Sequence, residues 1–211
     1  MPHMRQRSLD PLLKRSLTFW PVVCLIGARQ VGKSTLLRKL PGRKYLSLDD
    51  PALLDLASRN PKSLLSPPCS IDEAQKSPRI FDAVKLDVDE EKKPGKYILT
   101  GSVRFSQRIL IREALTGRAK TLQLFPFTCA EANELPHILR WTLDGDRPFQ
   151  PRLSRKLFEK HLERGGMPAI FAARNFVEAR SYWKSLIDGY VYRDLPLTLE
   201  KNGRPALAAA I

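Results

Sequence analysis

The chain has 211 residues, of which 43% are hydrophobic and 27% are charged. These shares are those of a soluble globular protein and argue against both global disorder and a membrane protein. The length predicts one good-sized domain, with room for a smaller appendage. The 36 basic and 22 acidic residues give a net charge of +14, which favours polyanionic partners such as nucleotides, nucleic acid or an acidic protein surface. Because the charge is spread along the chain, a solvated basic surface is the first interpretation and nucleic-acid binding the second.

The cysteines and the amino-terminal residues favour a reducing compartment. Cys24, Cys69 and Cys129 stand among apolar residues, without the spacing of a zinc site or a disulfide framework, so reduced core cysteines are expected. The apolar stretch 19–26 follows a basic start, but Pro21 interrupts it and no small-residue cleavage site follows. No stretch approaches the roughly 20 apolar residues of a membrane span. A cytoplasmic protein without a membrane partner is therefore expected.

Residues 8–125 alternate between apolar runs and helical patterns. The run 22–26 is apolar throughout, as in a strand buried on both faces of a parallel sheet. Further strands are predicted at 45–48, 69–71, 97–99 and 121–125, and helices at 8–17, 33–40, 52–57, from Pro78 onward and at 104–115. This alternation predicts an α/β domain over residues 1–135, with a five-stranded parallel sheet flanked by helices.

The sequence changes character after Thr128, where no further strand is predicted. Thr128 and Glu131 have the spacing of a capping box at a helix start. Glycine and prolines at 143–151 predict a linker, and helices are expected at 153–162 and 176–190 on either side of a break at 165–168. The aromatic face of the last helix predicts packing rather than a ligand site. Residues 136–211 are therefore expected to form a helical region.

Residues 27–34 match the P-loop pattern G-x-x-x-x-G-K-[ST] at every fixed position, between an apolar strand and a helix. Backbone N–H groups of such a turn wrap the phosphates of ATP, while Lys33 would reach the β- and γ-phosphates and Ser34 would bind magnesium. Thr35 lies one position too far along the helix to replace Ser34. The nucleotide-binding residues predicted in this segment are Gly27, Ala28, Arg29, Gln30, Val31, Gly32, Lys33, Ser34 and Thr35.

Asp72 and Glu73 follow the predicted third strand. In a P-loop enzyme Asp72 would hold magnesium together with Ser34, and Glu73 would polarise the attacking water, so that Glu73 and Lys33 would be catalytic. The strand before them, 67–71, is less apolar than expected at this place. A solvated helix cap without a catalytic role is the alternative interpretation.

Three further residues are candidates at strand ends. Thr100 and Ser102 follow the fourth strand, where a hydroxyl could sense the γ-phosphate, although a simple turn is nearly as good an explanation. Arg118, just before the fifth strand, occupies the place where an arginine finger is presented to a neighbouring subunit. Arg108 and Arg112 are alternatives for that role, and so is an ordinary surface arginine.

These motifs together resemble the prokaryotic AAA-domain ATP-binding proteins of the AAA+ superfamily. The segments that carry the resemblance are 27–37, 48–51, 71–75, 99–102, 115–119 and 165–168. The resemblance implies an AAA+ core with strand order 5-1-4-3-2, followed by a C-terminal domain of unknown function. Family members continue well beyond this region, so the chain, which ends at Ile211, is expected to be C-terminally truncated.

The expected function is ATP binding with slow, magnesium-dependent hydrolysis, coupled to a partner or to a regulatory output. ATP and Mg²⁺ are the expected cofactors, and a homo-oligomer, a protein or nucleic acid are possible partners. One alternative is a nucleotide-dependent binding module that does not hydrolyse ATP, and another is a DNA-associated protein with a steep salt dependence. A small-molecule kinase is a weaker alternative, because no acceptor-binding pattern is recognisable.

Overall fold

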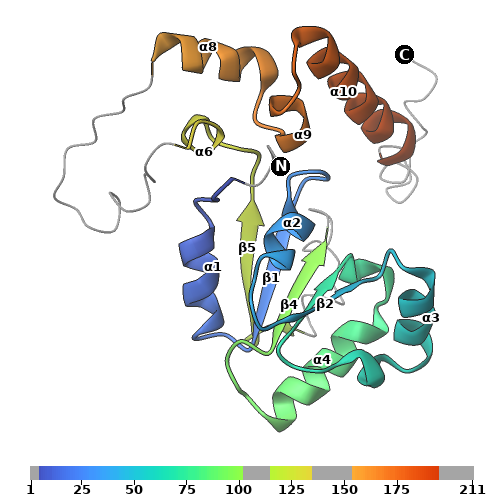
Figure 1. Cartoon of the computed structure of the whole chain (residues 1–211). Helices are drawn as coiled ribbons and strands as arrows, with labels where there is room; N and C mark the ends of the chain where they lie inside the picture. Colours follow the sequence, from blue (N-terminus) through green and yellow to red (C-terminus); the bar gives the residue numbers. More distant parts are fainter. Residues whose placement is uncertain (1–4, 102–114, 135–153, 195–211) are drawn as a thin grey trace, which may run out of the picture.

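The computed structural model describes residues 5–101, 115–134 and 154–194. Within these residues, five strands form one parallel sheet in the order β2-β3-β4-β1-β5 (Figure 1). The strands are β1 (Val22–Gly27), β2 (Lys44–Ser47), β3 (Cys69–Asp72), β4 (Tyr97–Gly101) and β5 (Ala119–Leu124). The predicted five-stranded parallel α/β fold and its strand order are therefore confirmed.

The two faces of the sheet are covered by different helices, as the alternation of side chains along β1 shows. Val22, Cys24 and Ile26 belong to the core cluster with α3 (Pro51–Arg59) and α4 (Arg79–Glu90). Val23 and Leu25 belong to the cluster with α1 (Asp10–Leu17) and α2 (Lys33–Arg38). Because successive side chains point to opposite faces, a strand that is apolar at every position marks a sheet covered on both sides.

Strand β3 is buried at all four positions although its sequence is only partly apolar. It lies inside the sheet between β2 and β4. Its polar Ser70 accepts a hydrogen bond from the guanidinium of Arg43, which also donates to the carbonyl oxygens of Cys69 and Gly95. The polar residue is tolerated in the sheet because it has a partner.

Most predicted element ends are correct within a few residues. Asp50 caps α3 by accepting a hydrogen bond of 2.8 Å from the N–H of Ala52, as its position before Pro51 indicates. Strand β5 begins at Ala119 instead of residue 121, because its first residue pairs with Val22 of β1. The pairing partner, not the local sequence, sets where this strand begins.

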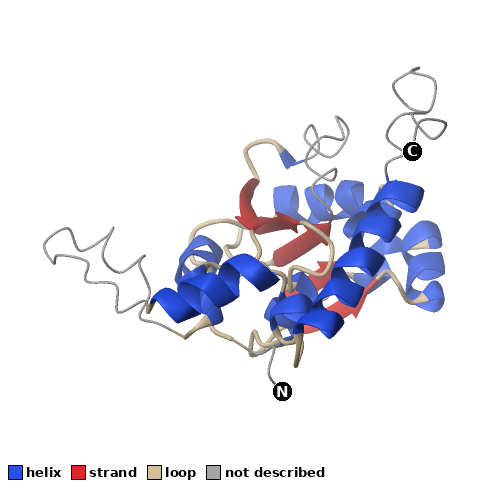
Figure 2. Cartoon of the chain, turned by 90° about the horizontal axis from the view of Figure 1, so that it is seen from above, coloured by secondary structure: helices blue, strands red, loops and turns tan. Residues whose placement is uncertain are grey.

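The helices after β5 lie beyond the carboxyl ends of the strands (Figure 1), and from above they lie in front of the sheet (Figure 2). They are α6 (Cys129–Ala132), α8 (Arg155–Arg164), α9 (Pro168–Phe171) and α10 (Phe176–Gly189), followed by the π-helical turn η4 (Tyr190–Asp194). The capping box at Thr128 is present. The linker predicted at 143–151 lies outside the described residues, and the division at residue 135 stays a prediction. Among the described helices, none is long and apolar enough to cross a membrane.

Candidate nucleotide-binding site

A cavity of about 350 Å³ opens at the carboxyl edge of the sheet, where β1 leads into α2. Lining residues come from the predicted P-loop and the end of β3, and others come from the amino-terminal segment, the residues after β5 and α9. Of the predicted site residues, those that line the cavity are Arg29, Gln30, Gly32, Lys33, Ser34, Thr35 and Glu73. The structure therefore brings the two halves of the predicted site to one place.

The backbone of the turn needs its two glycines for different reasons. A Cβ at Gly27 would overlap the carbonyl oxygen of Leu124 in β5. Gly32 has φ +99°, a left-handed conformation that residues with a Cβ rarely adopt. Gln30 adopts φ 59° without being glycine. Such conformations cost about 1–3 kcal/mol and cluster at ligand-binding sites.

Lys33 is buried at the first position of α2. Its ammonium donates hydrogen bonds of 3.0 Å and 2.9 Å to the carbonyl oxygens of Gly27 and Ala28, which lie in the same turn. Burial lowers the pKa of Lys33, and Glu73 and Asp72 act in the opposite direction by favouring the charged form. The turn thus holds a positive charge directly beside its own backbone.

Asp72 is buried at the end of β3 and is held from several sides. The hydroxyl of Tyr45 donates a hydrogen bond of 2.6 Å to Oδ2, and Thr100 donates to Oδ1. Burial alone would raise the pKa of Asp72, but hydrogen bonds from Ser34, Thr100 and Tyr45 outweigh it and hold the pKa below its ordinary value. An ionised carboxylate and the Ser34 hydroxyl therefore meet at the site.

Glu73 lines the cavity with a strained backbone, since its φ of 54° is left-handed. Its carboxylate accepts a hydrogen bond from the side-chain amide of Gln75, two residues further on. This conformation turns the chain sharply after β3, so that Asp72 is buried while Glu73 lines the cavity. Left-handed conformations of non-glycine residues are typical of functional sites, which favours a role for Glu73.

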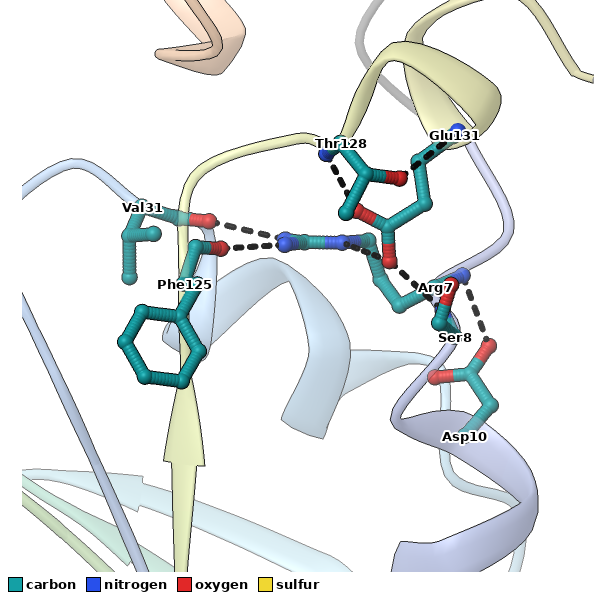
Figure 3. A network of polar contacts seen from close by, with 7 residues as sticks. All are labelled: Arg7, Ser8, Asp10, Val31, Phe125, Thr128 and Glu131. Carbon is teal, nitrogen blue, oxygen red and sulfur yellow. Dashed lines mark hydrogen bonds and ion pairs between the residues drawn. The ribbon is translucent and has the colours of Figure 1, made fainter. Parts of the chain in front are cut away.

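Arg7 lines the cavity, although no pattern in the sequence singles it out. Figure 3 shows its polar contacts. Arg7 is 6% exposed, and its guanidinium donates to the P-loop carbonyl of Val31 at 2.9 Å and to Phe125. It also forms a buried ion pair of 3.4 Å with Glu131 of α6. The same carboxylate accepts from the backbone N–H groups of Ser8 and Thr128. This network joins the amino-terminal segment, the P-loop and α6.

The segment 165–168, singled out by the resemblance, connects α8 with the cavity. Gly166 accepts a hydrogen bond of 2.7 Å from the N–H of Phe127, and a Cβ at Gly166 would overlap the Phe127 carbonyl oxygen. This close approach brings Pro168 and Ala169 of α9 into the cavity lining. Phe127 is a second lining residue that the sequence did not predict, because an apolar residue after a strand resembles an ordinary core residue.

Two predicted site residues, Ser102 and Arg118, remain to be placed. Ser102 is outside the described residues, as are the alternatives Arg108 and Arg112. Arg118 precedes β5, at the opposite edge of the sheet from the cavity, where its guanidinium donates two hydrogen bonds, of 2.6 Å and 2.8 Å, to the Asp89 carboxylate. Thr100 hydrogen-bonds Asp72 within the site.

A further prediction concerns the cysteines. In the segments that the structure covers, no cluster of three or more His, Cys, Asp or Glu side chains could hold a metal ion. Cys24 and Cys69 are buried free cysteines, as predicted, and Cys129 is partly buried. Burial raises the pKa of the Cys24 thiol to about 12.

The parallel sheet, the glycine turn between a buried strand and a helix, and the strand order define a P-loop NTPase fold. A family model described as AAA domain matches residues 20–133, more than half of the chain, so the chain belongs to this AAA domain family. The five strands and the P-loop turn lie within the matched residues.

Three known proteins are similar to this chain. The Walker-type ATPase PABY2304 of Pyrococcus abyssi has a similar fold, with a TM-score of 0.54 and 17% identity over 96% of this chain and 80% of that one. Uncharacterized protein Mb2031c of Mycobacterium bovis and uncharacterized protein Rv2008c of Mycobacterium tuberculosis are each 27% identical over 198 residues. These matches cover 91% of this chain but only 40% of either relative's length.

Proposed function

We propose that this domain binds Mg-ATP in the carboxyl-edge cavity and hydrolyses it to ADP and phosphate. The observation that carries the proposal is that Lys33, Ser34 and Glu73 line one cavity at the end of a parallel sheet, with Asp72 buried next to Glu73. Among the described lining residues, five are basic and only Glu73 is acidic; the basic ones are Arg5, Arg7, Arg29, Lys33 and Lys39. Such a lining suits a polyphosphate anion.

Each group of the turn has a place in this proposal. The backbone N–H groups of residues 27–34 bind phosphate oxygens, and Lys33 exchanges its carbonyl partners for phosphate. Ser34 and the ionised Asp72 offer the oxygen ligands that magnesium prefers. When bound, magnesium neutralises charge that develops on the phosphates. The apolar Phe127 and Pro168 give the cavity a second wall, suited to the base of the nucleotide.

Glu73 is the proposed general base, because among the described lining residues it alone is acidic and its left-handed backbone turns it toward the cavity. It orients and polarises the attacking water. Arg118, at the opposite edge, is proposed to complete the site of a second subunit. The output of the cycle, through a homo-oligomer or another partner, is part of the same proposal.

The test of the binding step is thermal unfolding with and without Mg-ATP. Ligand at about one hundred times its Kd stabilises a fold by about 2.7 kcal/mol, which raises Tm by about 5–10 °C for a chain of this size. Lys33→Ala removes the buried ammonium and should abolish most of the shift. Lys93→Ala, on the exposed loop after α4, is the matched control and should keep it. Wild-type protein without a nucleotide-dependent shift would contradict the proposal.

A further inference from the structure

Tyr45 lies on β2, outside the P-loop and outside the strand that carries the acidic pair. In the parallel register, Ser47 of β2 pairs with Asp72 of β3. Side chains two apart on a strand share a face, so Tyr45 lies on the same face of β2 as Ser47, diagonal to Asp72. From there its hydroxyl reaches Oδ2 of Asp72 at 2.6 Å.

The ring of Tyr45 is itself held in place by α2. It packs against the core cluster that contains Leu36 and Leu37, and the guanidinium of Arg38 lies 4.7 Å from its centroid. Helix α2 also carries Ser34, whose side chain lies near enough to Asp72 to lower the pKa of that carboxyl. Tyr45 therefore connects the helix of the P-loop with the carboxylate at the end of β3.

The two oxygens of Asp72 have different partners. Thr100 and the N–H of Glu73 donate to Oδ1, whereas Tyr45 donates to Oδ2. Without the tyrosine hydroxyl, the carboxylate could turn about its side-chain bond while Thr100 still holds one oxygen. A terminal torsion of this kind is broad, so an added hydrogen bond decides the orientation.

We propose that Tyr45 is a positioning residue for magnesium binding, which holds the Asp72 carboxylate in the orientation that it needs beside Ser34. The inference rests on the proposed function, since it concerns the same magnesium-dependent site. Tyr45 touches neither nucleotide nor metal in this role and acts through Asp72. Removal of its hydroxyl therefore weakens the gain in nucleotide affinity that magnesium provides and leaves metal-free binding unchanged.

The protein offers a matched control at the other end of the sheet. Tyr97, the first residue of β4, donates a hydrogen bond of the same length, 2.6 Å, to Asp87 of α4. Tyr97→Phe and Tyr45→Phe each remove one hydroxyl from one tyrosine–aspartate pair and keep the ring. Only the pair of Tyr45 contains a proposed magnesium ligand.

The experiment is a titration of a fluorescent ATP analogue at fixed Mg²⁺ concentrations and in EDTA. Tyr45→Phe should raise the Mg²⁺ concentration that gives half of the gain in nucleotide affinity by about threefold to tenfold. This is the size of effect expected for the loss of one hydrogen bond. Tyr97→Phe should lower Tm without moving this concentration. In an Asp72→Asn background, Tyr45→Phe should add no further change, because residues that act through one group are not additive.

Equal shifts in the two phenylalanine variants, or no shift in Tyr45→Phe, would overturn the role of Tyr45 while the proposed function stands. An additional effect of Tyr45→Phe in the Asp72→Asn background would also overturn it. Absence of any Mg²⁺ effect in the wild-type protein would instead count against the proposed function itself.

Discussion

Each edge of the sheet has a tyrosine that donates to an aspartate, Tyr97 to Asp87 and Tyr45 to Asp72. At the amino edge, two basic side chains have acidic partners. Lys96 is buried and forms an ion pair of 2.6 Å with Asp87, and Arg118 binds Asp89 through two hydrogen bonds. Burial and the bond to Asp87 raise the pKa of Tyr97. The amino edge is a closed set of contacts that holds α4 on the sheet.

The carboxyl edge has the same residue types beside a cavity. Its lining, in the described part of the chain, has more basic than acidic side chains, and Lys33 satisfies its ammonium with carbonyl groups of its own turn. Backbone strain at Gln30 and Glu73 occurs at this edge. The difference indicates that a hydrogen-bonded charge alone does not identify a site. Excess charge, backbone strain and a cavity at one place together identify a site.

Arg118 is the strongest test of this difference between the two edges. If Arg118 completes the site of a second subunit, as proposed, the amino edge is functional as well. A finger contributes about 10³–10⁵ in rate, so Arg118→Ala should lower turnover in an assembled protein by that order. Asp89→Ala frees the same arginine and is the matched control, which should keep turnover. Mixtures with Lys33→Ala should regain part of the activity, and activity should rise with protein concentration. Unchanged turnover in Arg118→Ala would leave Arg118 with a structural role only, in the ion pair with Asp89.

Glu73→Gln sharpens the comparison at the carboxyl edge. The substitution keeps the size and the hydrogen-bonding capacity of the side chain but removes the base, so turnover should fall by about 10²–10⁴ while ATP binding persists. Asp72→Asn should weaken magnesium-dependent binding as well. Phosphate release and nucleotide affinity, measured on the same samples, separate the two roles. Equal phosphate release by Glu73→Gln and wild type would remove Glu73 from catalysis, and absence of release from both would favour a binding module that does not hydrolyse ATP.

The Arg7–Glu131 pair tests how far the carboxyl edge depends on the buried network behind it. Loss of one partner leaves an uncompensated buried charge, so Arg7→Ala should lower the free energy of unfolding by about 3–5 kcal/mol. The exposed pair Arg155–Glu159 has a shorter distance, 2.7 Å. Even so, Arg155→Ala should lower the free energy of unfolding by less than about 1 kcal/mol. Denaturant unfolding measures both. Similar losses in the two variants would contradict the structural importance of the network.

Acid unfolding tests the same ion pair through the pKa of Glu131. Burial would raise the pKa of Glu131, but hydrogen bonds from Ser8 and Thr128 and the charge of Arg7 lower it. The ionised carboxylate therefore stabilises the fold above its ordinary pKa of about 4.3, and this contribution is lost as pH falls through the lowered value. Glu131→Gln should make the free energy of unfolding depend less on pH in this acidic range.

The contiguous features of the site could be predicted from the sequence. The P-loop is a local pattern, since its glycines, Lys33 and Ser34 perform their roles within one turn and one helix start. The alternation of strands and helices defined the parallel sheet, and the carboxyl ends of parallel strands meet at one edge. For that reason the sequence alone was enough to expect Asp72 next to the P-loop.

Only the tertiary structure decided which distant residues join the site. Arg7 and Glu131 are 124 positions apart, and Tyr45 and Asp72 are 27 apart. A single arginine or tyrosine has no periodic pattern, so nothing in the local sequence distinguishes a buried positioning role from a surface role. Strand register and the approach of Gly166 to Phe127 bring these groups together, and both are long-range contacts that no short segment encodes.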